Sequence, residues 1–353
     1  MPTLTAVSTA LPRYEITQSE IKSFAKKHFT GHIEDLDKLI ELFDNTGIVK
    51  RYFTVPIDWF AEEHGFEEKN NLYIQSATDL GAEASKKIFE KANIKPSDID
   101  YIIYINSTGL ATPSIDARLI NVLGLKKNIR RTPIWGLGCA GGAAGLSHAY
   151  HYLLGHPNHR VLVISVELCG LTFIPNDYTK SNLVATALFA DGAGAMLVSG
   201  DEIASEGLNI VDTRSTFYPD SLQVMGWNVV TKGMQVVFDK RIPVLISQIA
   251  EEELTAFLSD HRLTKNDITE YLYHPGGWKV LEAYVKAYNL PEEKFRYSKD
   301  ILRDFGNMSS STVLYVLDRY LTERKAGKSD DLKNHLISAL GPGFCSETLL
   351  VQW

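Results

Sequence analysis

Short runs of apolar residues, separated by glycine, proline and polar stretches, recur along the chain and predict buried β-strands. Six runs have this character: 101–106, 160–166, 194–198, 271–274, 335–340 and 348–353. Between them, apolar residues recur at helical spacing over 74–92 and 242–260. This alternation of strands and helices predicts a layered α/β fold with mostly parallel strands.

Two pairs of segments echo each other at nearly the same separation along the chain. SDIDYIIY (97–104) resembles NDITEYLY (266–273), which lies 169 positions later. GLGCAGGAAGLSHAYHYLL (136–154) resembles DFGNMSSSTVLYVLDRYLT (304–322), which lies 168 positions later. Two matches in the same order and at similar separation indicate an internal duplication.

The duplication predicts two copies of one α/β unit, the first over residues 1–203 and the second over residues 204–353. The second match places Cys139 over Asn307. Because matching positions in a pseudo-symmetric pair lie at matching places around the shared axis, we expect both residues to begin helices that face a common centre.

Cys139 lies among glycine and alanine residues, where an apolar run ends and a helix is predicted to begin. A helix N-terminus carries unpaired N–H groups and the positive end of the helix dipole. A thiolate is stabilised there, so we expect the pKa of Cys139 to be lowered and its nucleophilicity to be raised at neutral pH. The alternative is a structural cysteine buried in a helix contact between small residues.

A nucleophilic thiol needs a base and a site that stabilises developing negative charge. His274 ends the strand of the second copy, before a Gly-Gly turn and an amphipathic helix. Asn307 precedes another predicted helix. Either residue could instead be a satisfied loop or core residue, but together with Cys139 they form a candidate catalytic set.

The segments GLGCAGG, YHPGGW and FGNMSSS resemble the Cys–His–Asn signatures of type III polyketide synthases, the chalcone synthase family within the thiolase superfamily. STGLATPS, LFADGAGA and GPGF also resemble that family, in its order and spacing over nearly the whole chain. The resemblance implies a thiolase-like fold, in which two duplicated halves form a five-layered αβαβα arrangement. It also implies an enzyme that extends an acyl-CoA with malonyl-CoA and needs no metal or redox cofactor.

The resemblance implies that Cys139 accepts the acyl group, that His274 forms an ion pair with its thiolate, and that His274 and Asn307 donate to a thioester oxygen. Phe189 matches an aromatic gate between the CoA tunnel and the cavity. Val236 stands where plant members have a second gate phenylalanine, which would widen the cavity. Other matching positions are a cavity-side hydroxyl at Ser309, loop glycines at Gly341 and Gly343, and Thr112, through which one subunit of a homodimer would line its partner's cavity.

The sequence departs from the plant members at positions that bind the phosphates of CoA. Lys38 matches a CoA-binding lysine, but Glu41 and Asn45 stand where two further basic residues are expected. Arg51 and Lys279 are additional candidates for contacts with CoA. Each of these cations could instead be a solvated surface charge.

Three small residues, Ser107, Thr172 and Ala185, match positions that set cavity size in the family. Small residues there admit a long acyl chain in bacterial members, and VELCGLTF and NLVATALFADGAGA resemble bacterial alkylpyrone and alkylresorcinol synthases. We therefore expect a medium- or long-chain acyl starter and an alkylpyrone or alkylresorcinol product. The alternatives are a synthase that converts malonyl-CoA alone to a naphthalene, or small residues that merely pack against larger neighbours.

Other functions fit the motifs less well. A ketoacyl-ACP synthase needs a basic face for its carrier protein, which an acidic chain does not favour. A hydroxymethylglutaryl-CoA synthase uses a glutamate, for which we find no matching motif. A non-catalytic homologue that binds acyl-CoA or a partner protein is disfavoured by the intact Cys–His–Asn set.

Composition narrows the class of partner and the compartment. The 353 residues carry a formal net charge of −7, which disfavours a broad nucleic-acid surface. No apolar run approaches the roughly 18–20 residues that span a membrane. Three cysteines without a CxxC motif or a Cys/His cluster predict neither a disulfide framework nor a zinc site. A reducing cytoplasm is the expected location.

Overall fold

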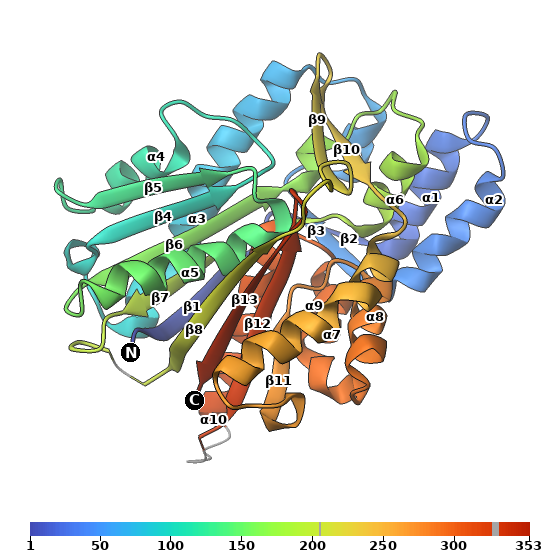
Figure 1. Cartoon of the computed structure of the whole chain (residues 1–353). Helices are drawn as coiled ribbons and strands as arrows, with labels where there is room; N and C mark the ends of the chain where they lie inside the picture. Colours follow the sequence, from blue (N-terminus) through green and yellow to red (C-terminus); the bar gives the residue numbers. More distant parts are fainter. Residues whose placement is uncertain (205, 327–331) are drawn as a thin grey trace.

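The computed structural model describes residues 1–204, 206–326 and 332–353 (Figure 1). Nine strands among these residues form one sheet: β1 (Thr3–Ala10), β4 (Tyr101–Asn106), β5 (Arg130–Trp135), β6 (Arg160–Leu168), β7 (Asp191–Ser199), β8 (Leu208–Phe217), β11 (Ile268–Tyr273), β12 (Asn334–Gly341) and β13 (Cys345–Gln352). Two separate ribbons pair β2 (Tyr14–Thr17) with β3 (Lys50–Phe53) and β9 (Met225–Val230) with β10 (Gly233–Phe238).

The helices pack on both faces of the sheet and at one end of it. They are α1 (Gln18–Phe29), α2 (Leu36–Leu39), α3 (Phe66–Ala92), α4 (Ile115–Leu123), α5 (Gly141–Leu154), α6 (Lys180–Leu188), α7 (Ile242–Asp260), α8 (Trp278–Tyr288), α9 (Arg296–Phe305) and α10 (Thr312–Ala326). Within the described parts of the chain, no helix has the length and apolar character that a membrane crossing requires.

The two halves of the chain repeat one arrangement, as the duplication predicts. Strands of the first half lie in the order β1-β7-β6-β4, and those of the second in the order β8-β13-β12-β11. In both series the first two pairings are antiparallel and the third is parallel. The halves join where β1 pairs with β8, with Thr3 opposite Asn209 and Leu4 opposite Leu208.

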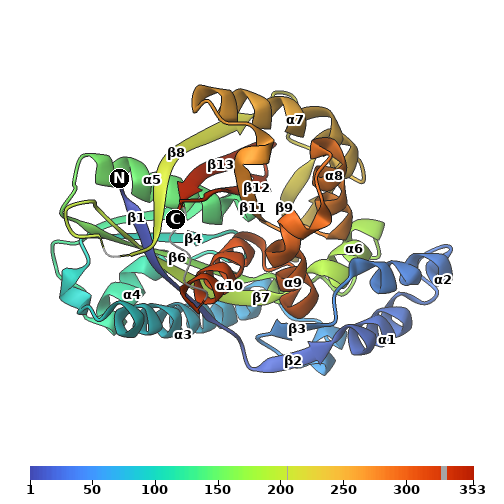
Figure 2. The ribbon, with the colours of Figure 1, turned by 90° about the horizontal axis from the view of Figure 1, so that it is seen from below.

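Three layers of helices enclose the two halves of the sheet (Figure 2). α3 covers the outer face of the first half, α7 and α8 cover that of the second, and α5 and α10 lie between the halves. The central core joins Leu146 of α5 and Leu314 of α10 to strand residues such as Val163 and Ile337. This is the expected five-layered αβαβα arrangement.

The prediction of mostly parallel strands is wrong. Of the eight pairings within the described sheet, three are parallel and five are antiparallel. The β12–β13 pair shows one reason, because the turn 342–344 is far too short for the crossover that parallel strands need.

The first internal match describes the structure closely. Short 3-10 turns precede β4 and β11, at Pro96–Asp98 and Lys265–Asp267, and they are 169 positions apart. In each turn the final aspartate accepts a hydrogen bond from the backbone N–H three residues earlier. The two copies therefore begin these strands with the same local device.

The second internal match differs by three residues from the separation of the helices in the structure. α5 begins at Gly141 and α10 at Thr312, which are 171 rather than 168 positions apart. By this register Cys139 corresponds to Ser310, and Asn307 lies five residues before its helix rather than two. The prediction that Cys139 and Asn307 occupy matching positions is wrong, although both precede helices of the central layer.

Candidate active site

Cys139 lies in a 3-10 turn, Gly138–Ala140, between β5 and α5. This turn packs directly against the loop after β12. A Cβ on Gly138, whose φ is +47°, would lie 2.7 Å from Cδ of Pro342, and a Cβ on Gly341 would lie 2.4 Å from the carbonyl oxygen before the turn. Glycine at both positions therefore allows the two loops to meet beside the thiol.

Cys139, Ser309 and Asn307 form a chain of contacts from the first half to the second. The thiol of Cys139 donates to Oγ of Ser309 over 3.6 Å. The backbone N–H of Ser309 donates to Oδ1 of Asn307 over 2.8 Å. Asn307 donates one amide N–H to the carbonyl oxygen of Gly276 over 3.0 Å, and its second amide N–H lies near the thiol.

His274 directly follows β11 and lies beside the same backbone segment. Its N–H donates to the carbonyl oxygen of Ser338 over 2.8 Å, and its carbonyl accepts from Gly276 over 3.1 Å. The side chain is 5% exposed, and neither ring nitrogen has a hydrogen-bond partner among the described residues. Because an unpaired buried polar group costs free energy, this imidazole is a candidate group for contact with a ligand.

Burial controls the protonation of both groups. It raises the pKa of Cys139 to about 12, against smaller lowering contributions from Ser309 and Asn307. It lowers the pKa of His274 to about 3. The expected lowering of the Cys139 pKa is wrong, because desolvation of the thiolate outweighs the helix terminus. Burial therefore disfavours the charged form of each group.

A buried glutamate that the sequence analysis does not identify lies next to this cluster. Glu167 of β6 is fully buried and accepts hydrogen bonds from the backbone N–H of Ser107 at 2.9 Å, from the Thr108 hydroxyl at 2.8 Å and from the Ser310 hydroxyl. Burial raises the pKa of Glu167, and these donors oppose that rise. The available signal was an acidic residue inside an apolar strand, since a buried carboxylate needs several donors.

The prediction that Ser107 sets the size of the cavity is wrong. Its hydroxyl donates to Glu167 over 3.0 Å, and its side chain is 2% exposed. Ser107 is not among the residues that line the cavity between α1, α6 and the β9–β10 ribbon. It instead helps to satisfy the buried carboxylate.

A cavity lies between α1, α6 and the β9–β10 ribbon. Four residues selected from the sequence line it: Thr172, Ala185, Phe189 and Val236. Its other aromatic walls are Phe24, Phe53, Phe60, Phe173 and Trp227, and Ile16, Ile21, Ile57 and Ile174 add aliphatic surface. The chain therefore holds a largely apolar chamber behind the expected gate.

Trp227 changes the expected shape of this chamber. It lies directly opposite Val236 in the β9–β10 ribbon, so both side chains share one face. Its ring centroid is 6.0 Å from that of Phe189, and the ring of Phe238 is 5.5 Å from Phe189 on centroids. The space that Val236 would open is therefore partly filled by a tryptophan that the sequence analysis does not identify.

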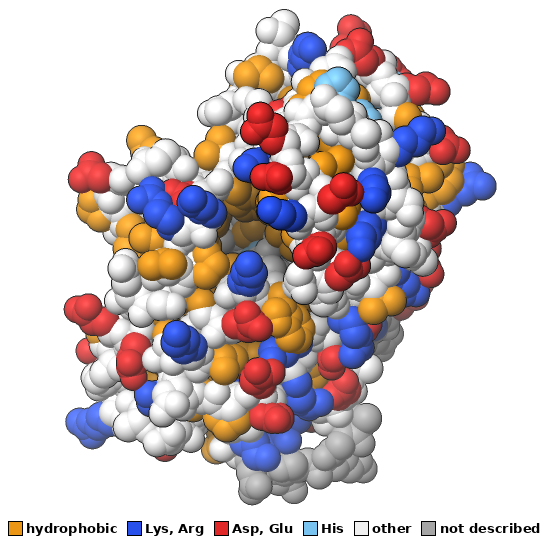
Figure 3. Space-filling model, turned by 90° about the vertical axis from the view of Figure 1, so that its right-hand side faces the viewer, with side chains coloured by type: hydrophobic (Ala, Val, Ile, Leu, Met, Phe, Trp, Pro, Cys, Tyr) orange, Lys and Arg blue, Asp and Glu red, His pale blue; other side chains and the backbone are white. Residues whose placement is uncertain are grey.

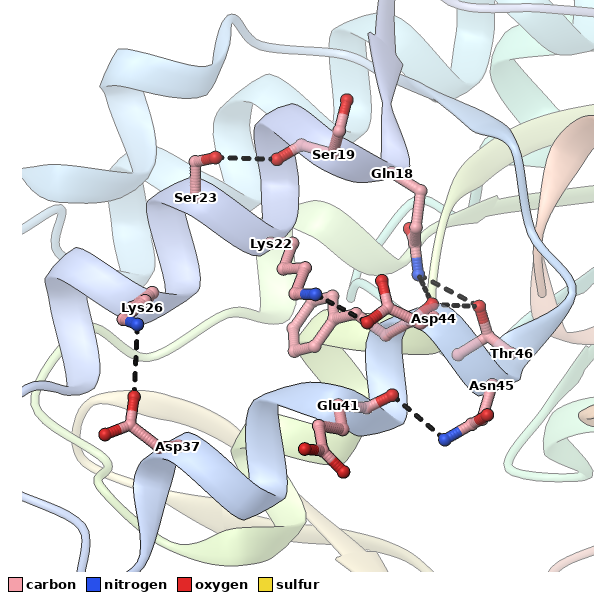
Figure 4. A network of polar contacts seen from close by, with 11 residues as sticks. Gln18, Ser19, Lys22, Ser23, Lys26, Asp37, Glu41, Asp44, Asn45 and Thr46 are labelled. Atoms are coloured by element: carbon pink, nitrogen blue, oxygen red, sulfur yellow. Dashed lines mark hydrogen bonds and ion pairs between the residues drawn. The ribbon is translucent and has the colours of Figure 1, made fainter.

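The surface between α1 and α2 carries paired charges (Figure 4). Lys22 pairs with Asp44 over 2.5 Å, and Lys26 pairs with Asp37 over 3.1 Å. Lys38 is exposed on α2 and forms no ion pair with a described residue. Of these three lysines, Lys38 is the one whose charge is not already paired with a described carboxylate and is therefore available to bind an anion.

Glu41 and Asn45, which replace two basic residues of the plant members, supply no cation here. Asn45 donates to the carbonyl oxygen of Glu41 over 3.1 Å. The adjacent Gln18 donates to Thr46 over 3.1 Å and to the carbonyl oxygen of Ala187 over 2.9 Å. Gln18 thereby ties the segment to α1, as Figure 4 shows, and its bond to Ala187 ties α1 to α6.

The prediction that Arg51 contacts CoA is wrong. Alternation along β3 turns its neighbours Lys50 and Tyr52 toward solvent and turns Arg51 inward, where its side chain is fully buried. Its Nη1 donates to the carbonyl oxygen of Phe189 over 2.6 Å. A surface phosphate cannot reach this guanidinium.

The remaining predicted residues lie at the rim or on the surface. Lys279 is exposed on α8, Thr112 is exposed in the loop before α4, and Gly343 lies beside Phe217 rather than beside the thiol. On the face that carries α1, α6 and α8, a hollow has a hydrophobic floor and a rim of both basic and acidic side chains (Figure 3). In the described parts of the chain, no group of three or more His, Cys, Asp or Glu side chains is placed to hold a metal ion.

Comparison with known proteins gives a consistent result. The family model of the N-terminal domain of chalcone and stilbene synthases matches residues 1–202, and that of the C-terminal domain matches residues 209–353. A Bacillus subtilis (strain 168) protein, provisionally named a chalcone synthase, is 40% identical and the alignment covers 100% of this chain and 99% of that protein.

Two tetrahydroxynaphthalene synthases are also similar over nearly their whole length. The 1,3,6,8-tetrahydroxynaphthalene synthase of Streptomyces peucetius subsp. caesius is 36% identical, over 99% of this chain and 92% of that protein. The solved structure of the 1,3,6,8-tetrahydroxynaphthalene synthase of Streptomyces coelicolor A3(2), a bacterial type III polyketide synthase, has a TM-score of 0.94 at 29% identity, covering 99% of both chains.

Proposed function

Since the chain belongs to the chalcone and stilbene synthase family, we propose that it condenses malonyl-CoA onto a medium- or long-chain acyl-CoA and closes the product to an alkylpyrone or alkylresorcinol. Its coarser function is that of a type III polyketide synthase, an acyl-transferring condensing enzyme with the thiolase-like fold. This membership sets aside the ketoacyl-ACP synthase, the hydroxymethylglutaryl-CoA synthase and the non-catalytic homologue.

The observation that carries the proposal is the apolar character of the cavity. Aromatic and aliphatic side chains make up most of its walls, and small residues at Thr172 and Ala185 leave room between them. An alkyl chain gains about 0.8 kcal/mol for each CH₂ group that it buries in such surroundings. A growing poly-β-ketone built from malonyl units alone carries many carbonyl groups, whereas side chains that can donate hydrogen bonds, such as Thr186 and Gln235, are a minority of these walls.

In the proposed acyl transfer, Cys139 is the nucleophile and neutral His274 is the base. Sγ attacks the thioester carbon while the S–H proton moves to the imidazole, and the bond from that carbon to the sulfur of CoA breaks. The imidazolium then returns the proton to the CoA thiolate. The imidazole can take this role because neither of its ring nitrogens has a hydrogen-bond partner among the described residues, so one is free to accept the proton.

Asn307 and His274 act together in the proposed decarboxylation. Malonyl-CoA loses carbon dioxide, and the electron pair of the broken bond moves to the thioester oxygen as an enolate. Asn307 holds one N–H toward the region of the thiol, and a neutral His274 offers one N–H, so both can donate to this oxygen. The enolate carbon then attacks the acyl group on Cys139 and releases the thiolate.

Lys38 and Lys279 are proposed to meet the phosphates of CoA at the surface. Both are exposed, and neither forms an ion pair with a described residue. The proposed steps transfer protons and acyl groups but no electrons to an acceptor, so CoA thioesters are sufficient as reactants.

A second candidate function is supported by the relatives. Proteins named 1,3,6,8-tetrahydroxynaphthalene synthase are 36% and 30% identical to this chain over nearly its whole length. That product requires malonyl-CoA alone. Trp227 beside Phe189 also favours a narrower chamber than an unobstructed alkyl tunnel would have.

Product analysis separates the two candidates. Acyl-CoA starters from two to sixteen carbons, each supplied with malonyl-CoA, are followed by mass spectrometry, and we expect products that incorporate the longer starters. Ala185→Phe should shift the preference toward shorter starters, whereas Val244→Phe, on the exposed face of α7, should leave it unchanged. A single naphthalene product from malonyl-CoA with every starter would reject the acyl-chain proposal.

We also propose a homodimer in which the loop around Thr112 meets the partner. Trp135 is 47% exposed on β5, an edge strand of the described sheet, and it donates to the carbonyl oxygen of Gly109 over 3.2 Å. Leu110 beside it is 39% exposed. Light scattering should give twice the 39.4 kDa of one chain. Trp135→Glu should lower that mass and Leu222→Glu should not, whereas a monomeric wild type would reject the proposal.

A further inference from the structure

Arg51 is buried next to Phe189, the residue that matches the aromatic gate. Its side chain is fully buried on β3, and Nη1 donates to the carbonyl oxygen of Phe189 over 2.6 Å. Phe189 ends α6 and its ring lines the cavity. The guanidinium therefore holds the backbone of the residue whose ring forms the gate.

The same arginine also contacts the segment that carries Asn307. Its stem packs so closely on Gly306 that a Cβ there would lie 2.7 Å from both Cγ and Cδ of Arg51. The N–H of Asn307 donates to the carbonyl oxygen of Leu188 over 2.9 Å, and the N–H of Ala190 donates to the carbonyl oxygen of Asn307 over 2.9 Å. Arg51 thus contacts both sides of a short backbone bridge between the gate and the amide.

The buried carboxylate of Asp191 also helps to hold the guanidinium of Arg51 in place. Asp191 is fully buried, attracts the guanidinium, and accepts from the backbone N–H groups of Gly170 and Thr54 over 2.6 and 2.8 Å. Burial lowers the pKa of Arg51 to about 9, so the group stays charged at neutral pH. Nε and Nη2 have no hydrogen-bond partner among the described residues, which leaves the bond to Phe189 and the nearby carboxylate to hold the charge.

We propose that Arg51 is a positioning residue that holds the gate Phe189 and the amide of Asn307 as one unit, so that malonyl decarboxylation is coupled to carbon–carbon bond formation. The inference rests on the proposed roles of Phe189 and Asn307. Arg51 also lines the cavity, and the role assigned to it is positional because Nη1 is bonded to the backbone of Phe189.

The proposal predicts a specific kinetic pattern for Arg51→Met. A displaced Asn307 amide weakens enolate stabilisation, and we expect kcat for malonyl-CoA decarboxylation to fall about 10- to 100-fold, in the range that a misplacement of about 1 Å causes. KM for malonyl-CoA should change less than about twofold, because no binding contact is removed. The number of carbon dioxide molecules released per condensation product should rise.

Two variants separate positioning from other roles. Arg51→Lys keeps a cation near Asp191 and should recover part of kcat and part of the coupling ratio. Arg13→Met removes an exposed arginine just before the same ribbon and should match the wild type in both. Circular dichroism and thermal melting establish the folded fraction, so that kcat is expressed per folded enzyme.

The outcomes distinguish this inference from the proposed function. If the wild type condenses malonyl-CoA but folded Arg51→Met keeps its kcat and its coupling ratio, Arg51 does not position the site. A rise in KM with unchanged kcat would also overturn the inference, since it would indicate a binding role. A wild type that forms no polyketide from any starter would instead reject the proposed function, whatever Arg51 does.

Discussion

The turns before α5 and before α10 occupy the same place in two copies of one unit, yet they present different chemistry. Before α5, Cys139 stands two residues from the helix in a turn packed with glycine. Before α10, Asn307 stands five residues from the helix, and Ser309 between them has a φ of +47°. The three-residue difference shows that duplication fixes where the helices begin, while the turn ahead of each decides which side chain reaches the site.

The comparison also shows how each half supplies what the other lacks. The thiol of the first half contacts Ser309 of the second, and the Gly341 loop of the second half packs on the turn of the first. Cys139 belongs to the first half, and His274 and Asn307 belong to the second. The candidate site therefore exists only at the junction of the copies.

The largest effect is expected from removing the sulfur of the first half. Cys139→Ala should lower chain extension by at least about 10³-fold, because the acyl intermediate is proposed to form on this sulfur. Some malonyl decarboxylation should remain, since Asn307 and His274 of the second half are intact. Carbon dioxide release and product formation are measured together. Equal loss of both would show that decarboxylation also depends on Cys139 of the first half.

The second half is tested by changing the amide of Asn307. Asn307→Ala should reduce decarboxylation about 10²- to 10³-fold by loss of one donor. Asn307→Asp should be slower still, because a carboxylate repels the enolate oxygen. Equal rates in the two variants would contradict the electrostatic role assigned to this residue.

The pH dependence of alkylation tests whether the thiol of the first half forms an ion pair with the imidazole of the second. With the pKa of Cys139 raised to about 12, its thiolate fraction grows with pH throughout the neutral range. Iodoacetamide should therefore react about tenfold faster for each pH unit from 6 to 8, since only the thiolate reacts. A rate already at its plateau at pH 6 would instead reveal a preformed thiolate–imidazolium pair.

The smallest effect concerns the packing between the two central helices. A Cβ on Gly142 of α5 would lie 2.3 Å from the carbonyl oxygen of Ser310, so Gly142→Ala should destabilise the fold by about 1–3 kcal/mol. Gly155→Ala, at the other end of the helix, meets no atom closer than 3.8 Å and should have little effect. Denaturant midpoints measure both, and equal midpoints would mean that the helices do not meet as described.

Six of the nine strands in the described sheet could be predicted because they are short, largely buried apolar runs. β4 spans the predicted 101–106, and α7 spans the predicted 242–260. The β9–β10 ribbon escaped prediction because its strands are only partly buried and lack a clear apolar pattern. The direction of the strands also escaped prediction, since an apolar run looks the same in a parallel and an antiparallel pair.

The residues of the candidate site could be predicted from the sequence, but the burial of their side chains could not. Cys139, Asn307 and Ser309 do lie together, but their sequence could not show that burial would raise the pKa of the thiol. Arg51 was expected to be a surface cation because its neighbours Lys50 and Tyr52 are polar. The alternation of side chains along β3 buries it, and the sequence did not reveal that β3 is a strand.

The central claim is that Cys139 of one half carries the acyl group and His274 of the other half makes it reactive. Mass spectrometry of the wild type after brief exposure to an acyl-CoA, followed by peptide mapping, tests this most directly. The account predicts one acyl group on Cys139 and an acylation rate lowered about 10²- to 10⁴-fold in His274→Ala. Acylation at Cys169 or Cys345, or an unchanged rate in His274→Ala, would contradict it.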